Sequence, residues 1–277
     1  MGAAAVSKEG CSCQCRDKFD TLASDPDGLF EIQQLAYDDS TGEGSAASKD
    51  WQSTGKAQAS KPPKPKARPK LEDKDGGSYT GEWLGTWRHG KGVQVWADGS
   101  RYIGQWKDDL PHGRGRLEEA SVYDGSWKFG KANGMGTLFG LYNSRYEGRW
   151  LDDLQHGEGE EILPDGGRYV GSYAFGKRCG QGKFIWPDGS VYKGSFDNNF
   201  FHGHGEVKFA DGRAYDGQWQ ENMMHGQGRF KWLDGRSYMG SYQNDQRHGS
   251  GKFSWPDGRI YEGQWFQGKQ HGSGTYT

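Results

Sequence analysis

A tyrosine that returns at a nearly constant interval is the feature that most restricts how this chain folds. Nine such tyrosines follow one another at 23 residues, apart from one interval of 21. They are Tyr79, Tyr102, Tyr123, Tyr146, Tyr169, Tyr192, Tyr215, Tyr238 and Tyr261. An internal repeat of this length predicts an array of small supersecondary units, each of which buries its apolar side chains against its neighbours.

Glycine and aromatic residues recur at fixed places around each tyrosine. If the tyrosine is position 0, glycine stands at position 2 and an aromatic residue at position 4 in all nine copies. Glycine also occupies positions 11 and 13 of every copy, and Asp-Gly closes six copies at positions 19 and 20. The period of two indicates strands, and Asp-Gly favours a tight turn between strands. Each copy is therefore predicted to be a β-hairpin, too small to be stable alone.

The pattern YxGxW, then HGxG, then a closing DG resembles the MORN repeat, and the resemblance covers residues 77–277. It implies an all-β fold: an elongated, single-layer antiparallel sheet of stacked hairpins with an aromatic groove. Nine hairpins make 18 strands, which would extend roughly 80 Å. Repeats 2 and 3 lack Asp-Gly, so we expect local irregularity around residues 115–145. Repeat 9 ends at Thr277 without its turn, which predicts either a frayed hairpin or a chain that continues further.

Composition and charge narrow the classes of partner. Only 32% of the residues are hydrophobic, too few for a deep core but enough for a thin sheet with one face of Trp, Tyr and Phe. Residues 76–277 carry 24 basic and 24 acidic side chains, so the array is neutral. Proteins that stack single-stranded nucleic acid on aromatic rings pair those rings with a strongly basic groove. No nucleic-acid partner is therefore expected.

Residues 1–75 differ from the repeats and are predicted to be a disordered tail, because they are poor in apolar residues. Met1-Gly2 suggests N-myristoylation at Gly2, although Val6 stands where the signal needs Ser or Thr. Cys11, Cys13 and Cys15 are candidates for palmitoylation. A basic, proline-rich linker is a candidate contact for anionic lipid, and its basic residues are Lys61, Lys64, Lys66, Arg68 and Lys70. The alternative is a cytosolic tail whose cysteines are incidental.

No catalytic or metal-binding motif is found. The sequence holds no nucleophile motif, no distinctive carboxylate pair and no phosphate loop, so neither an enzyme nor a cofactor is expected. Histidine occupies position 10 in seven of nine repeats. Copies in adjacent repeats would lie roughly 10 Å apart, whereas ligands of one zinc ion each lie about 2 Å from it. The histidines are therefore predicted to be structural, with ring nitrogens bonded to backbone groups.

These observations favour a non-enzymatic scaffold that binds a protein partner in the aromatic groove. Trp219, Tyr242 and Trp265 are the predicted contacts, because aromatic residues dominate interface energies; the competing interpretation is that they hold the sheet together. The resemblance implies a cytoplasmic setting at the cytoskeleton, the cilium or a membrane contact. It also leaves open a membrane- or phosphoinositide-associating module, such as the regulatory region of a phosphatidylinositol phosphate kinase whose catalytic domain lies outside this sequence.

Overall fold

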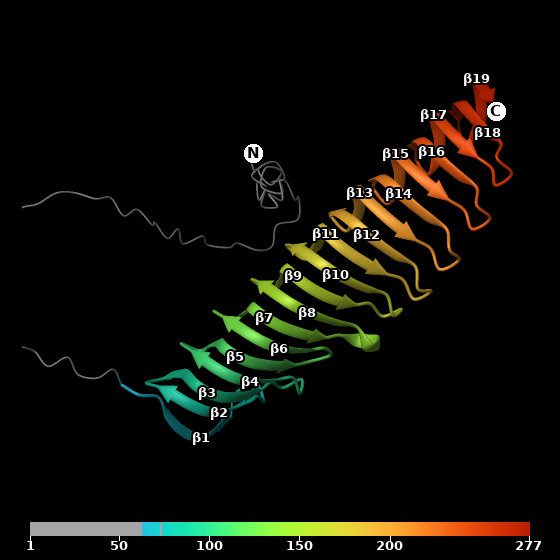
Figure 1. The fold of residues 1–277 in the computed structure, drawn as a ribbon. Helices are drawn as coiled ribbons and strands as arrows, with labels where there is room; N and C mark the ends of the chain where they lie inside the picture. The colour runs from blue at the N-terminus through green and yellow to red at the C-terminus, as the bar shows by residue number, and fades with distance from the viewer. Residues whose placement is uncertain (1–62, 73) are drawn as a thin grey trace, which may run out of the picture. The chain divides into compact units, whose positions relative to one another are not determined.

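The computed structural model describes residues 63–72 and 74–277. The predictions for Gly2, Cys11, Cys13, Cys15 and Lys61, and for disorder in residues 1–62, lie outside the described residues. Within them, 19 strands form one antiparallel sheet. Each strand pairs with the strands before and after it in sequence, as Figure 1 shows, so that β1 and β19 lie at the two edges. The fold class predicted from the sequence is confirmed.

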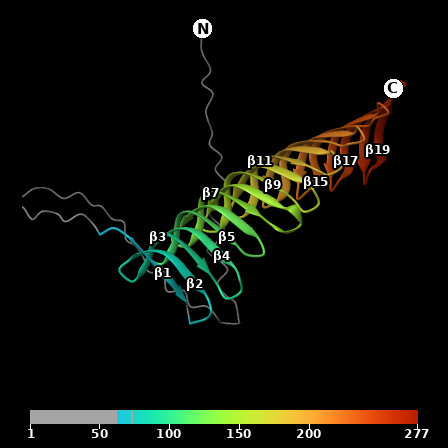
Figure 2. The same ribbon diagram turned by 90° about the horizontal axis from the view of Figure 1, so that it is seen from below.

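Each repeat contributes a shorter strand with the YxGxW motif and a longer one with the HGxG motif. Figure 2 shows that the hairpins are bent, which gives the sheet a curved cross-section. The strands are β1 (Lys66–Glu72), β2 (Ser78–Leu84), β3 (Trp87–Val95), β4 (Arg101–Lys107), β5 (Leu110–Glu118), β6 (Val122–Lys128), β7 (Lys131–Phe139), β8 (Arg145–Leu151), β9 (Leu154–Ile162), β10 (Arg168–Ala174), β11 (Lys177–Ile185), β12 (Val191–Asp197), β13 (Phe200–Lys208), β14 (Ala214–Gln220), β15 (Met223–Lys231), β16 (Ser237–Gln243), β17 (Gln246–Ser254), β18 (Ile260–Phe266) and β19 (Lys269–Tyr276).

Glycine pairs make room for the tyrosines. In repeat 6 the Cα atoms of Gly194 and Gly205 are direct partners across β12 and β13. The ring of Tyr192 lies over this bare backbone and is completely buried. Its hydroxyl donates a hydrogen bond of 2.9 Å to the carbonyl of Ser195. All nine tyrosines make the same bond to the residue at position 3.

The aromatic ring at position 4 links neighbouring repeats. Tyr192 contacts Phe196 of its own repeat at 5.3 Å between ring centroids and Trp219 of the next repeat at 5.5 Å, both edge to face. The indole N–H of Trp219 donates to the carbonyl of Gly205 in the preceding repeat, at 3.0 Å. The edge-to-face contacts recur from Trp83 to Trp265, so the core is one continuous row of rings. Geometry of this kind adds to the free energy of area burial.

The hairpin turns are hydrogen-bonded to the preceding repeat. Asn222 adopts a left-handed backbone with φ of 68°. Its N–H donates to the carbonyl of Phe201 at 3.1 Å, and its Oδ1 accepts from the N–H of Phe201 at 2.7 Å. Asp109, Asp153, Asn199 and Asp245 make the same pair of bonds. Asn and Asp suit this place because they tolerate positive φ better than most residues.

The structure corrects one prediction about the tail and shows where the repeats are irregular. Residues 66–72, predicted as disordered linker, form β1, which pairs with β2 and raises the number of strands from 18 to 19. Without β1, one edge of β2 would have N–H and C=O groups without a paired strand, and β1 pairs with that edge. In repeat 3 the irregularity is confined to the 3-10 turn η1 (Leu141–Asn143), while β6, β7 and β8 remain paired. β19 pairs with β18, so repeat 9 forms its hairpin.

Candidate protein-binding face

The two faces of the sheet differ in chemistry. Side chains at positions 0, 4, 9, 15 and 17 form the aromatic face, whereas those at positions 1, 3, 12 and 14 form the outer face. Tyrosines at position 0 are between 0% and 6% exposed, so the aromatic face supplies the core. The outer face is mostly polar. A binding surface on the aromatic face must therefore come from the side chains that lie above the tyrosine row.

The three predicted groove residues are buried. Trp219, Tyr242 and Trp265 are 8%, 5% and 4% exposed, and each packs edge-on against two tyrosines. Little of any of these rings is left for a partner to touch. Their burial agrees with the competing interpretation, in which these rings hold the sheet together, and direct contact of a partner with them stays a prediction.

The partly exposed side chains of this face include a row of aromatic residues at position 17. We call Trp186, Phe209, Trp232 and Trp255 the rim row, and Phe184, Val207, Phe230 and Phe253 at position 15 the floor row. The two rows interlock: the ring of Trp232 lies 4.5 Å from Phe230 in its own repeat and 5.5 Å from Phe253 in the next. The sequence signal for this surface is the alternation of aromatic or apolar residues at positions 15 and 17 of repeats 5 to 8.

In repeats 6 to 8 an arginine lies over each ring of the rim row. The guanidinium carbons of Arg213, Arg236 and Arg259 are 4.9, 5.6 and 5.4 Å from the ring centroids of Phe209, Trp232 and Trp255. Each arginine pairs with the aspartate two residues before it, such as Asp234 with Arg236 at 2.6 Å. The backbone N–H and guanidinium of Arg236 lower the pKa of Asp234. Repeats 6 to 8 therefore present three similar surfaces, each consisting of an aromatic ring and an arginine that is paired with an aspartate.

Arg247 is a half-buried cation on the same face. It lies 4.3 Å from the ring centroid of Trp265 and 5.3 Å from that of Phe253, and it donates to the carbonyl of Gly268 at 2.7 Å. Burial lowers its pKa. The arginines at the same position of repeats 1 and 5 pair with carboxylates, Arg88 with Asp109 and Arg178 with Glu161. Among the described residues no carboxylate forms an ion pair with Arg247.

A polar cluster interrupts the aromatic face between repeats 4 and 5. Glu161 accepts from Arg178 at 2.6 Å and from the hydroxyl of Tyr173 at 2.9 Å. Desolvation, together with the adjacent Glu161 carboxylate, raises the pKa of Tyr173. Apolar side chains occupy the equivalent places at the boundary of repeats 6 and 7, where Val207 and Met224 stand. The cluster therefore marks the N-terminal limit of the rim row.

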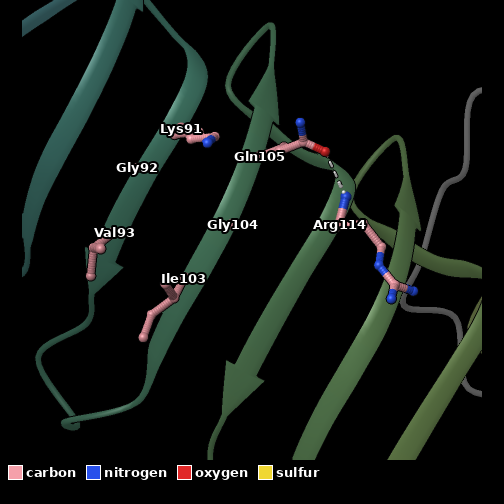
Figure 3. Close-up of a pocket in the computed structure, with 7 residues that line it drawn as sticks. All are labelled: Lys91, Gly92, Val93, Ile103, Gly104, Gln105 and Arg114. Atoms are coloured by element: carbon pink, nitrogen blue, oxygen red, sulfur yellow. Dashed lines mark hydrogen bonds between the residues drawn. The ribbon is translucent and has the colours of Figure 1, made fainter.

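The outer face has shallow hollows. Figure 3 shows one of about 550 Å³ on β3, β4 and β5, where Val93 and Ile103 face each other and the backbone N–H of Arg114 donates to Gln105 at 2.8 Å. Another, of about 730 Å³, is lined by side chains of both charges, among them Lys183, Lys193 and Asp216. The second hollow also contains Ser195 and His204. His204 pairs with Asp216 at 3.1 Å, whereas the hydroxyl of Ser195 accepts from Gln181 at 2.8 Å, and no hydrogen bond joins Ser195 to His204 in the described part of the chain.

The histidines at position 10 are packed into the sheet without side-chain hydrogen bonds at several of their buried nitrogens. The buried Nδ1 atoms of His112, His156 and His225 have no hydrogen-bond partner in the described part of the chain, so the prediction that they bond backbone groups is wrong. The ring of His112 instead contacts Phe129 at 5.7 Å. Within residues 63–72 and 74–277, no group of three or more His, Cys, Asp or Glu side chains could hold a metal ion.

Four of the basic residues of the linker are described and all four are exposed; three of them belong to β1. Lys64 precedes the strand, Lys66 lies opposite Trp83, and Lys70 pairs with Glu72 at 3.5 Å. Arg68 lies over the ring of Trp83 at 5.5 Å and donates to the carbonyl of Gly85 at 2.7 Å. None of the helices in the described residues is both long enough and apolar enough to span a membrane.

A single sheet of stacked hairpins with one aromatic face defines this chain as a β-hairpin repeat protein. The family model of the MORN repeat matches residues 79–101, 102–118, 123–140, 146–168, 169–191, 192–212, 215–235, 238–258 and 261–277. The nine matches cover more than half of the chain and coincide with the tyrosine repeats. The chain belongs to the MORN repeat family. A search of curated proteins found no match.

Solved structures with a related arrangement of strands include the TCP10 domain of Danio rerio CPAP in complex with a peptide of Danio rerio STIL. That structure has a TM-score of 0.41 and 16% identity, and the match covers 74% of this chain and 97% of that one. The G-box domain of the microcephaly protein CPAP has a TM-score of 0.39 and 14% identity, with 73% and 100% coverage. The SAS-4 TCP domain of Drosophila melanogaster, bound to a proline-rich motif of Ana2, has a TM-score of 0.31 and 12% identity, with 60% and 84% coverage. These scores are too low to support an argument about function.

Proposed function

We propose that this protein is a non-enzymatic scaffold that binds an extended segment of a protein partner along the rim row of repeats 5 to 8. The observation that carries this proposal is the row itself. Trp186, Phe209, Trp232 and Trp255 are half-buried rings held at equal intervals on a rigid sheet. Apolar rings that are held in place and partly exposed are the usual anchors of protein interfaces.

The dimensions and charge of the row favour a peptide over a small molecule. Adjacent repeats are two strand spacings apart, so the four rings span about 29 Å. The row is an open strip, whereas small-molecule sites are usually concave and enclose most of the ligand. Its arginines are largely neutralised by Asp211, Asp234 and Asp257. Aromatic and arginine side chains are both enriched at the centres of protein interfaces.

Selection of peptides from a random display library on the full chain tests the proposal. Peptides that bind should lose affinity when Trp232→Ala or Trp255→Ala is introduced. Trp96 occupies position 17 of repeat 1, is 37% exposed and has Ser100 in place of the arginine, so Trp96→Ala is a matched control. Selected peptides whose binding is insensitive to both rim substitutions, or equally sensitive to Trp96→Ala, would contradict the assignment.

We further propose that the scaffold acts in the cytoplasm, in association with the cytoskeleton. Its neutral array offers no electrostatic attraction to an anionic membrane, and Arg68 and Lys70 make contacts within the sheet or with a neighbouring residue of β1. Fractionation of cells should recover the protein with the cytoskeleton. Recovery with membranes that is lost after Gly2→Ala and replacement of Cys11, Cys13 and Cys15 by serine would instead establish a lipid-anchored tail.

A further inference from the structure

We infer that the rim row recognises a proline-rich segment in the polyproline II conformation, with acidic residues directed toward Arg247. This inference rests on the proposed function and specifies the class of partner. It depends on four properties of repeats 6 to 8: the spacing of the rings, the orientation of the row across paired strands, the hollow between adjacent loops, and the charge of Arg247.

The spacing of the rings matches the pitch of a polyproline II helix. Equivalent rings in adjacent repeats are separated by two strands, or about 9.6 Å. A polyproline II helix has three residues per turn and rises about 3.1 Å per residue, so every third residue returns to the same side after about 9.3 Å. Prolines at every third position would therefore meet Phe209, Trp232 and Trp255 in succession, with a mismatch of only about 0.3 Å per repeat.

The rim row runs across the strands, so a partner lying along it cannot be recognised by adding a strand to the edge of the sheet. The rings follow one another across the strands, and β13 to β17 are each hydrogen-bonded to a strand on both sides. A partner lying along the row finds no free strand edge, so it must be recognised through its side chains and outward-facing carbonyl groups. Polyproline II presents both, because it has no internal hydrogen bonds and aromatic grooves are its usual receptors.

The loops provide places for flat apolar rings. A hollow of about 390 Å³ lies between the loops of repeats 6 and 7, and Trp232, Leu233, Arg213 and Arg236 contribute to its lining. Leu233 is 77% exposed. A proline ring would stack on the indole there. An arginine has five N–H donors, of which Asp211 and Asp234 use few, so the remaining donors can bond the carbonyl groups of the peptide.

Arg247 determines the preferred charge of the segment. Its guanidinium lies on Phe253, the floor residue that also contacts Trp232 of the rim row, so it borders the proposed site. The groups that act on its charge are Tyr238, Tyr242 and Arg236, and the charge of Arg236 is itself paired with Asp234. A half-buried cation that has no carboxylate partner among the described residues attracts an acidic residue, whereas a basic peptide would meet repulsion from Arg247.

Three labelled peptides test the inference by fluorescence anisotropy with the full chain. One consists of repeated Glu-Pro-Pro triplets; the second keeps the conformation but reverses the charge with Lys-Pro-Pro; the third keeps the charge but loses the conformation with Glu-Gly-Gly. The Glu-Pro-Pro peptide should bind at least about tenfold more tightly than either of the others, because affinity here depends on both preorganisation and charge.

Protein variants locate the site. Trp232→Ala should weaken binding of Glu-Pro-Pro about tenfold or more, as loss of a central aromatic anchor does, while Trp96→Ala should leave it unchanged. Arg247→Met introduces the residue that stands at the same position of repeat 7, Met224, so packing is retained. It should abolish most of the preference for Glu-Pro-Pro over Lys-Pro-Pro. Circular dichroism of each variant establishes that the sheet is intact before binding is compared.

The outcomes separate this inference from the function on which it rests. Equal binding of Glu-Gly-Gly and Glu-Pro-Pro would overturn the conformational part, and an unchanged charge preference in Arg247→Met would overturn the role of that arginine. If neither proline peptide binds while peptides from the display library still require Trp232, the inference fails and the scaffold stands. If no library peptide depends on Trp232, both fail.

Discussion

A single methyl group added at Gly205 tests the idea that glycine pairs hold the tyrosine row. A Cβ atom built on Gly205 lies 2.5 Å from both Cε2 and Cζ of Tyr192, and closer still to its hydroxyl oxygen. The backbone φ of Gly205 is not in the left-handed region, so space alone forbids the alanine. Tyr192 has nowhere to move: Phe201 is stacked on it with 3.9 Å between ring centroids, and Phe196 and Trp219 hold its edges.

The expected cost of Gly205→Ala is about 3 kcal/mol. Overpacking a core by a methyl group usually costs about 1–3 kcal/mol, and the upper end applies because both the ring and the backbone beneath it are confined. The double variant Tyr192→Ala/Gly205→Ala provides the control. Tyr192→Ala alone leaves a cavity and costs about 3–5 kcal/mol, but with the ring gone the added methyl group has room. The double variant should therefore lose roughly 2 kcal/mol less stability than the sum of the two single variants.

Amide hydrogen exchange is the suitable assay, because a repeat array does not unfold as a single two-state unit. Protection should fall in β12, β13 and β14 and remain unchanged in β2 and β3, which lie far away in the array. Protection factors in Gly205→Ala that match the unsubstituted protein, or strict additivity with Tyr192→Ala, would refute the role assigned to the glycine pair.

Three further outcomes follow from the core. Glu161→Val alone should cost about 2 kcal/mol, because it leaves the half-buried Arg178 without its carboxylate partner, whereas Glu161→Val/Arg178→Met, which copies Val207 and Met224 at the boundary of repeats 6 and 7, should recover most of the loss; chemical denaturation measures both, and an equal loss in the double variant would contradict this explanation. Asn222→Ala should cost about 1–2 kcal/mol, since it removes the bond to the N–H of Phe201 and strains a positive φ, while Asn222→Asp should be neutral; thermal unfolding that does not separate the two would argue against the role of this hydrogen bond. Burial raises the pKa of Tyr79, Tyr123 and Tyr238 to about 12, against about 10 in an unfolded chain. The stability that this shift contributes is fully present below about pH 10 and is lost as the pH rises toward 12, so tyrosinate absorbance should appear together with loss of the strand signal; ionisation near pH 10 with the sheet intact would be inconsistent with buried tyrosines.

The sequence by itself determined the strands, their order and their register. Alternation with period two leaves one choice of face for each strand, and the nearly constant interval of 23 residues favours the same pairing in every repeat. Gly194 opposite Gly205 is a direct consequence, because a tyrosine two residues before Gly194 needs bare backbone beside it. These features depend on contacts within one hairpin or between adjacent ones, which is why local pattern was sufficient.

Only the tertiary structure decided which aromatic residues are available to a partner. Trp219 and Trp232 look alike in the sequence, yet the first is buried among Tyr192, Tyr215 and Phe201, whereas the second lies just beyond the end of β15 and is partly exposed. β1 pairs with β2 across an edge that no repeat pattern describes. The missing carboxylate partner of Arg247 likewise depends on packing between repeats. The exposure of a side chain and the pairing of its charge depend on neighbours that are distant in sequence, and a local sequence pattern does not contain this information.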